Sequence, residues 1–168
     1  MTQLKIKIEN FETTNKKVKI KGKIISEINK GKEIKTEISI LQLAKIWETD
    51  KEVLKELRKT WFGSKELESK CLQTQKLIKK FPKIPTRNNE VSFDYTSVKD
   101  NIINTDSQGK KEELVKIFAE DLNGWEGEGI IITLRKETYK KYFQNKKELW
   151  LKMSPDTIKI GVTNNTKS

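Results

Sequence analysis

Lysines recur at every second position near the start of the chain, a spacing that places them on one face of extended strands. They are Lys5, Lys7, Lys17, Lys19, Lys21 and Lys23, and Lys35 follows in the next such tract. Neighbouring strands lie about 4.8 Å apart, and side chains on one face repeat about every 6.8 Å. Phosphates along a nucleic-acid backbone have a comparable spacing. The pattern therefore predicts a sheet surface that binds a phosphate backbone through several lysines.

The overall charge of the chain favours a polyanionic partner. There are 35 lysines and arginines against 24 acidic residues, and residues 1–35 hold ten lysines against four glutamates. Only Arg58, Arg87 and Arg135 are arginines. Because the arginine fork reads bases whereas lysine acts as a point charge on phosphate, we expect backbone binding and leave DNA and RNA equally open. The competing explanation is a lysine-rich coding bias on a face that only needs charge for solubility.

A second basic set begins at Arg135, Lys136 and Lys140 and continues along a predicted helix over 136–152. These residues would extend a groove for nucleic acid if they lay beside the first lysine face. Charged residues are also the ordinary covering of a solvated helix. The set is therefore a secondary candidate for the same partner.

The residues needed for catalysis are scarce. The chain has no histidine, which excludes mechanisms that need an imidazole, and Cys71 is the only cysteine. Glu33 and Lys35 match the E-x-K half of a metal-dependent nuclease site, and Glu126 and Glu128 lie in a glycine-rich turn. Such fragments arise readily by chance in a chain rich in Lys and Glu. We expect no enzymatic activity, metal or cofactor, and keep a nuclease as a minor alternative.

The first half of the chain is predicted to combine a sheet with helices. Apolar residues alternate with charged ones over 4–8, 18–24 and 34–40, which predicts a three-stranded antiparallel meander. A capping box at 49–52 begins a helix that ends near Gly63, and a second helix follows over about 65–80. The apolar face of the meander would pack on these helices.

The second half is predicted to mix helix and strand. The expected elements are a strand over 91–95, a helix over about 110–122, a strand over 130–134, the helix over 136–152 and a strand over 157–162. The fold class expected is therefore α+β. The expected organisation is a meander with a helix pair (1–81), an irregular connector (82–109), a C-terminal part packed on the first as one domain (110–163) and a disordered tail (164–168).

The large aromatic residues are assigned to the core, because the predicted lysine face carries none of them. They are Trp61, Phe62, Trp125, Tyr139, Tyr142 and Trp150. No apolar run is long enough to cross a bilayer, and the N-terminus has no signal-peptide pattern, so we expect a cytoplasmic protein. The expected function is non-enzymatic nucleic-acid binding. The main alternative is a small protein inhibitor or accessory subunit of a nucleic-acid-processing complex, of the phage or mobile-element type.

Overall fold

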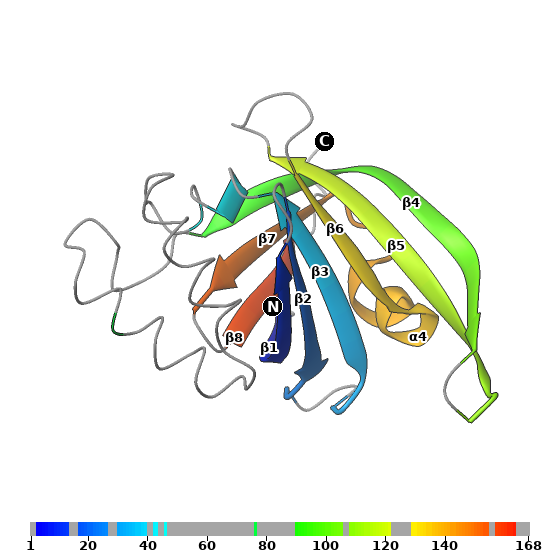
Figure 1. Ribbon diagram of the computed structural model, residues 1–168. Coiled ribbons are helices and arrows are strands. Elements are labelled where there is room, and N and C mark those ends of the chain that lie inside the picture. Colours follow the sequence, from blue (N-terminus) through cyan, green and yellow to red (C-terminus); the bar gives the residue numbers. More distant parts are fainter. Residues whose placement is uncertain are drawn as a thin grey trace.

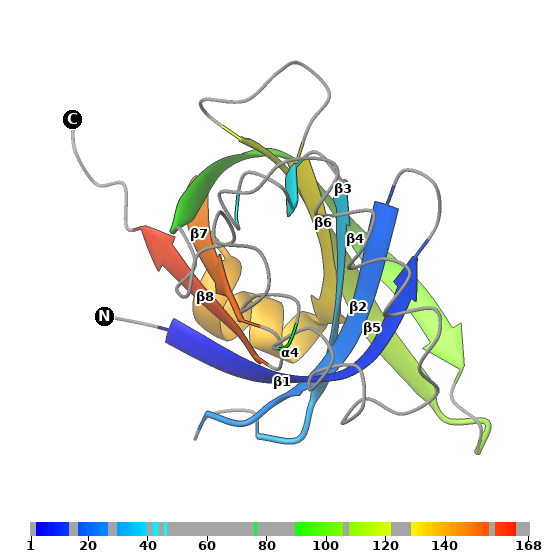
Figure 2. The same ribbon diagram turned by 60° about the vertical axis from the view of Figure 1, so that its left-hand side comes forward.

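The protein forms a closed barrel of eight antiparallel strands in the residues that the structure describes (Figures 1 and 2). The computed structural model describes residues 3–13, 17–26, 30–39, 42–43, 46, 76, 90–105, 108–121, 129–154 and 157–163. The strand order around the barrel is β1-β2-β3-β6-β5-β4-β7-β8. The ring closes because β1 pairs with β2 on one side and with β8 on the other.

Each strand is linked to its neighbours by an antiparallel ladder. The strands are β1 (Gln3–Thr13), β2 (Lys17–Ile24), β3 (Glu33–Ser39), β4 (Val91–Thr105), β5 (Lys111–Asp121), β6 (Gly129–Arg135), β7 (Glu148–Met153) and β8 (Thr157–Thr163). Between β6 and β7, the short helix α4 (Lys136–Thr138) runs directly into the π-helical turn η1 (Tyr139–Phe143). Gln42, Leu43, Ile46 and Lys76 are also helical.

The interior of the barrel is a packed apolar core. Buried and exposed residues alternate along β2 without exception, so every second side chain points inward. Leu43 and Ile46, which lie outside the strands, and Phe143 of η1 are fully buried in the same core. Full burial of one such side chain contributes roughly 1.5–3 kcal/mol. Apolar alternation on the inside therefore leaves the outer faces of the strands exposed to solvent.

The predicted α+β fold class is wrong, because the described chain is an all-β barrel with little helix. The three strands of the meander, the strand over 130–134 and the strand over 157–162 are confirmed as β1, β2, β3, β6 and β8. The helix predicted over about 110–122 is instead β5. Its inner face carries Val115 and Ile117 while its outer face carries Leu114 and Phe118, so apolar residues on both faces imitate a helical period.

The helix predicted over 136–152 is right only in its first half. The helical segment ends at Phe143, Asn145 adopts a positive φ of 64°, and the chain continues as β7. Residues 82–109, predicted as an irregular connector with one short strand, contain the 15-residue strand β4. The helices predicted over 49–63 and about 65–80 and the tail 164–168 lie outside the described residues, except that Lys76 is helical.

The two halves of the sequence share one barrel. Strand β3 of the first half pairs with β6 of the second, and β1 pairs with β8. The helical segment packs its Tyr142 and Phe143 onto the common core, and Figure 2 shows it seated against the ring of strands. No helix in the described part of the chain is long and apolar enough to cross a membrane.

Candidate functional site

All seven lysines predicted to share one face point out of the barrel. Lys5, Lys7, Lys17, Lys19, Lys21, Lys23 and Lys35 are exposed, and the residues between them on β1, β2 and β3 are mostly buried. The register places Lys7 directly opposite Lys23, and Lys21 directly opposite Lys35. The structure therefore brings these side chains together on a continuous outer surface of three neighbouring strands.

Two further lysines extend this surface across β8 and β7. Lys159 of β8 stands directly opposite Lys5 of β1 on one side and Lys152 of β7 on the other. We call Lys152, Lys159 and Lys5 the lysine row, and these three together with the other six lysines the outer lysine surface. Lys152 and Lys159 were not predicted as site residues. The sequence signal for Lys152 is the alternation of inward Leu149, Leu151 and Met153 in β7, and it is weakened because the outward residue Trp150 is itself apolar.

Carboxylates accompany the lysines on β2 and β3. The Glu33 carboxylate lies 3.3 Å from Lys21 Nζ and 3.9 Å from Lys35 Nζ. Lys23 Nζ lies 3.7 Å from the Glu9 carboxylate. These pairs are exposed, so each contributes little to stability, but they lower the local positive charge.

The lysine row is different. Lys152, Lys159 and Lys5 form no ion pair with any residue that the structure describes. Like charges placed directly opposite each other across two strands are destabilising. Lys7 and Lys19 also form no ion pair with described residues, but Lys19 stands opposite two glutamates and Lys7 opposite one lysine. Lys159 has a lysine opposite it on both sides, so the row is the part of the outer lysine surface where like charges are most concentrated.

Trp150 lies on the outer face of β7 beside the lysine row, contrary to its predicted place in the core. It is half-buried, and its indole packs on Gly161 of β8, its direct partner in register. A Cβ at position 161 would overlap the indole ring, so the contact needs a glycine there. Trp150 is two residues from Lys152 on the same strand, and Gly161 is two residues from Lys159.

The second basic set is matched by acidic residues. Arg135 lies 3.7 Å from the Glu112 carboxylate, and Lys136 Nζ lies 3.2 Å from Glu113 and 3.6 Å from Asp100. The hydrogen bond to Glu113, with the nearby Asp100, raises the pKa of Lys136 above its ordinary value. We call these five residues the paired cluster.

The predicted site residue Lys140 lies beside the paired cluster. It is exposed on η1 and lines a groove of about 440 Å³ with Lys111 and members of the cluster. The structure thus places Arg135, Lys136 and Lys140 among carboxylates of β4 and β5. It does not join them to the lysine row.

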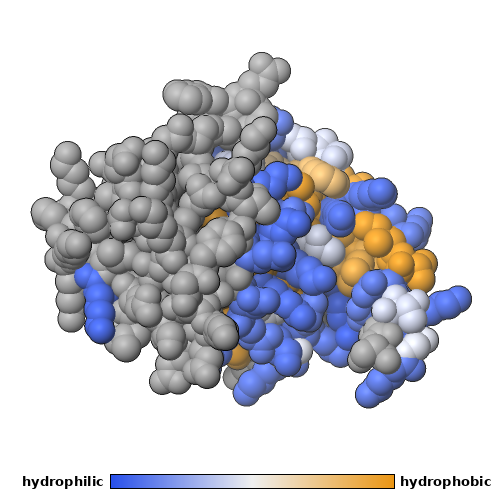
Figure 3. All heavy atoms as spheres, viewed as in Figure 1, coloured by the Kyte–Doolittle hydropathy of each residue, from blue (hydrophilic) through white to orange (hydrophobic). Residues whose placement is uncertain are grey.

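A larger groove of about 490 Å³ crosses the outer face from β1 to β4. Lys19, Lys21, Lys35 and Lys116 line it together with Ile102 and Ile103. Figure 3 shows hydrophobic patches beside charged residues in this part of the molecule, and Ile103 and Val98 are 57% and 37% exposed. The groove is therefore basic on the side of β2 and β3 and apolar on the side of β4.

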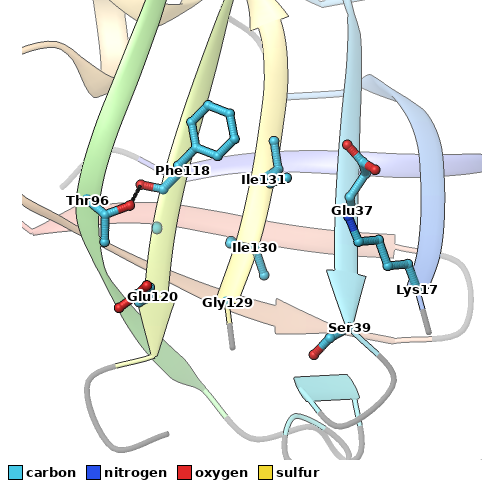
Figure 4. Close-up of a pocket in the computed structure, with 10 residues that line it drawn as sticks. Lys17, Glu37, Ser39, Thr96, Phe118, Glu120, Gly129, Ile130 and Ile131 are labelled. Atoms are coloured by element: carbon cyan, nitrogen blue, oxygen red, sulfur yellow. Dashed lines mark hydrogen bonds between the residues drawn. The ribbon is translucent and has the colours of Figure 1, made fainter. Parts of the chain in front are cut away.

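A smaller hollow of about 210 Å³ lies near the start of β2. In Figure 4, Phe118 and Ile131 project from neighbouring strands on the same side as Glu37. Their apolar side chains continue the hydrophobic area of the larger groove. The outer faces of β4, β5 and β6 thus carry an apolar strip, made of Ile102, Leu114, Phe118 and Ile131.

Only some of the acidic residues that suggested a metal-dependent nuclease belong to the part of the chain that the structure describes. Glu33, the carboxylate of the E-x-K fragment, is engaged with Lys21 and Lys35. Glu126 and Glu128 lie outside the described residues. Within the ranges that the structure describes, no three His, Cys, Asp or Glu side chains come together in a group that could hold a metal ion.

Comparison of the chain with protein-family models, with curated proteins and with solved structures finds no match.

Proposed function

We propose that this chain is a non-enzymatic nucleic-acid-binding protein that holds the phosphate backbone on its outer lysine surface. The observation that carries the proposal is the lysine row, in which Lys159 stands between Lys5 and Lys152 without a carboxylate partner among the described residues. This arrangement costs stability in the isolated protein. A bound polyanion would replace the repulsion among the lysines with attraction, and would release its own counterions.

The geometry of the surface suits backbone contacts better than base reading. Lysine is a flexible point charge, and neighbouring members of the row stand about 4.8 Å apart across the strands. Contacts to phosphate position a protein but carry no sequence information. We place this activity in the cytoplasm, which the use of a single cysteine in 168 residues favours.

Fluorescence anisotropy with labelled single- and double-stranded DNA and RNA tests the proposal. A variant in which Lys5, Lys152 and Lys159 are all changed to Gln removes the charges of the lysine row but keeps polar side chains only one atom shorter. For single strands, each lost phosphate contact lowers the slope of log affinity against log salt by about 0.7. We therefore expect weaker binding and a slope lower by about 2.

The matched control changes Lys111, Lys140 and Lys141 to Gln. These three exposed lysines of β5 and η1 form no ion pair with described residues, and their loss changes the net charge equally. We expect the control to bind nearly as tightly as the unmodified protein. Equal weakening in both variants would show an effect of net charge alone, and absence of binding to all four probes would overturn the proposed function.

A second candidate function is the protein-interaction role of an inhibitor or accessory subunit. The apolar strip favours it, because exposed apolar patches beside charged residues are common at protein interfaces. An acidic protein surface with an apolar centre would complement the strip and the lysines of the neighbouring groove.

The two functions separate on which surface controls binding. Changing Ile102 and Phe118 to Ser removes apolar area from the apolar strip and leaves the lysine row and the net charge unchanged. If the chain acts on nucleic acid alone, this variant binds the labelled probes like the unmodified protein. If it acts through a protein, the variant loses a stoichiometric complex in size-exclusion chromatography while nucleic acid does not compete.

A further inference from the structure

Trp150 is an aromatic side chain on the outside of a sheet, next to the lysine row. Its two strand neighbours, Leu149 and Leu151, are fully buried, so the indole projects from the opposite face. Part of the ring rests on Gly161, and the side chain as a whole is half-buried. The contact with β8 limits the positions that the ring can adopt, which prepares it as a surface on which a flat ligand can lie.

The indole N–H is the one polar group of the Trp150 side chain. Trp150 Nε1 donates no hydrogen bond to any residue that the structure describes, and it is not among the buried polar atoms that lack a partner. A tryptophan N–H usually finds an acceptor when it is buried. At Trp150 it therefore remains available to solvent or to a ligand.

The neighbours of Trp150 are polar or basic. Trp150 stands directly opposite Ser92 of β4 on one side and Gly161 of β8 on the other, and Gly161 stands opposite the exposed Gln3 of β1. The lysine row is the adjacent row on the same face, about 6.8 Å further along the strands. An aromatic ring and three cations thus lie within about 12 Å of one another.

We propose that Trp150 stacks a base of single-stranded nucleic acid whose neighbouring phosphates lie on the lysine row. This inference rests on the proposed function and specifies its substrate as a single strand. Proteins that bind single strands combine a basic surface with aromatic side chains on which bases stack. The bases of a duplex are stacked inside the helix and do not reach the indole, although the duplex phosphates still reach the lysines.

The competing role of Trp150 is structural, because an aromatic side chain on a neighbouring strand often covers a glycine within a sheet. Two substitutions separate the roles. Trp150→Leu keeps an apolar cover over Gly161 but removes the aromatic face. Trp150→Phe keeps an aromatic face of smaller area.

The test measures the affinity of each variant for a labelled oligo(dT) single strand and for a duplex of equal length. Stacking on one aromatic side chain accounts for roughly a 5- to 150-fold difference in single-strand affinity. We expect Trp150→Leu to lose affinity for the single strand within that range, with the salt slope and duplex affinity unchanged. We expect Trp150→Phe to retain most of the single-strand affinity, and circular dichroism to show both variants folded.

Tryptophan fluorescence provides a second measurement that does not depend on the Leu variant folding. Oligo(dT) should quench the emission of the unmodified protein more than that of Trp150→Phe, because a stacked base quenches the indole. Equal quenching in the two proteins would overturn the inference.

Other outcomes separate this inference from the proposed function. If the variant lacking the lysine row binds weakly while Trp150→Leu binds the single strand normally, stacking is wrong and backbone binding stands. If Trp150→Leu weakens single-strand and duplex binding equally, the indole acts through the fold and the inference is also overturned. If neither change alters binding, both proposals fail.

Discussion

Two basic regions of the barrel exterior differ in what stands beside their cations. In the paired cluster, Arg135 and Lys136 each lie within 4 Å of carboxylates supplied by β4 and β5. In the lysine row, the direct neighbours of Lys159 across the strands are Lys5 and Lys152. The same residue types therefore neutralise acidic groups in one region and repel one another in the other.

The difference shows why counts of basic residues do not locate a binding surface. The basic residues at 135, 136 and 140 are as closely spaced in the sequence as the lysines of β1. The fold nevertheless surrounds Arg135 and Lys136 with acidic side chains. Cations that already have partners must release them before they contact phosphate. The lysine row has no such partners to release within the described chain, so it is the better candidate for binding.

The contact between Trp150 and Gly161 is the place beside the lysine row where we expect a substitution to have the largest effect on stability and binding. In Gly161→Ala, the added methyl group would overlap the indole, so the ring or the strand must shift. Overpacking of this kind costs about 1–3 kcal/mol. Denaturant unfolding should show this loss, and single-strand binding should weaken as the indole moves. Ser92→Ala, on the other side of Trp150 in the same row, is the control and should stay within about 0.5 kcal/mol of the unmodified protein.

Charge reversal at the centre of the lysine row should affect stability and binding in opposite directions. Lys159→Glu replaces two like-charge neighbours with two attractive ones, which should raise the free energy of unfolding by about 0.5–2 kcal/mol. It should also weaken binding to nucleic acid, because the carboxylate repels phosphate. Urea unfolding and anisotropy on one preparation measure both effects. A variant that loses stability would show that the repulsion inferred for the row is absent.

Four of the strands predicted correctly, β1, β2, β3 and β8, have a mainly polar outer face, whereas β6 was predicted from a continuous apolar run. In β2, apolar inward residues alternate with Lys17, Lys19, Lys21 and Lys23, so the period of two is plain. In β7, the outward Trp150 falls between Leu149 and Leu151 and hides that period. The two strands that were predicted as helix, β5 and β7, both carry apolar side chains on both faces, and Trp150 is one of these side chains.

The closure of the barrel could not be predicted from local sequence patterns. The pairing of β1 with β8 joins residues at opposite ends of the chain, and nothing in either strand alone specifies that neighbour. The outward direction of Lys5 could be predicted from the alternation in β1. Its position beside Lys159 and Lys152 could not, because it depends on closure of the ring.

In the paired cluster, removal of a carboxylate should lower the free energy of unfolding, which is the opposite of the effect expected for Lys159→Glu in the lysine row. Glu112→Gln leaves Arg135 without its partner at 3.7 Å, so the free energy of unfolding should fall by about 0.2–1 kcal/mol. The loss should shrink in high salt, which screens the ion pair. Nucleic-acid affinity should stay level or rise slightly, since the change adds positive charge. A clear fall in affinity would mean that the cluster, rather than the lysine row, holds the ligand.

The loss of stability at high pH should test the ion pairs of the paired cluster, because Lys136 and the tyrosines near it lose their protons there. The hydrogen bond to Glu113, with the nearby Asp100, raises the pKa of Lys136, and burial raises the pKa of Tyr95 and of Tyr139. A pKa that is raised in the folded state means that the unfolded chain releases its proton first. The stabilisation is therefore complete below the ordinary pKa values, which are about 10 for tyrosine and about 10.4 for lysine, and is lost as the pH rises through the folded values.

Urea unfolding between about pH 8 and about pH 11 measures this loss. The free energy of unfolding should fall with a shallower slope in Lys136→Met than in the unmodified protein, because that variant no longer contributes the Lys136 part of the pH dependence. Lys140→Met is the matched control, since Lys140 is exposed beside the cluster and forms no ion pair with described residues. Identical slopes in all three proteins would mean that Lys136 does not hold its carboxylate partners in solution. The contrast between a paired and an unpaired basic region would then lose its basis, because both regions would present uncompensated cations to a polyanion.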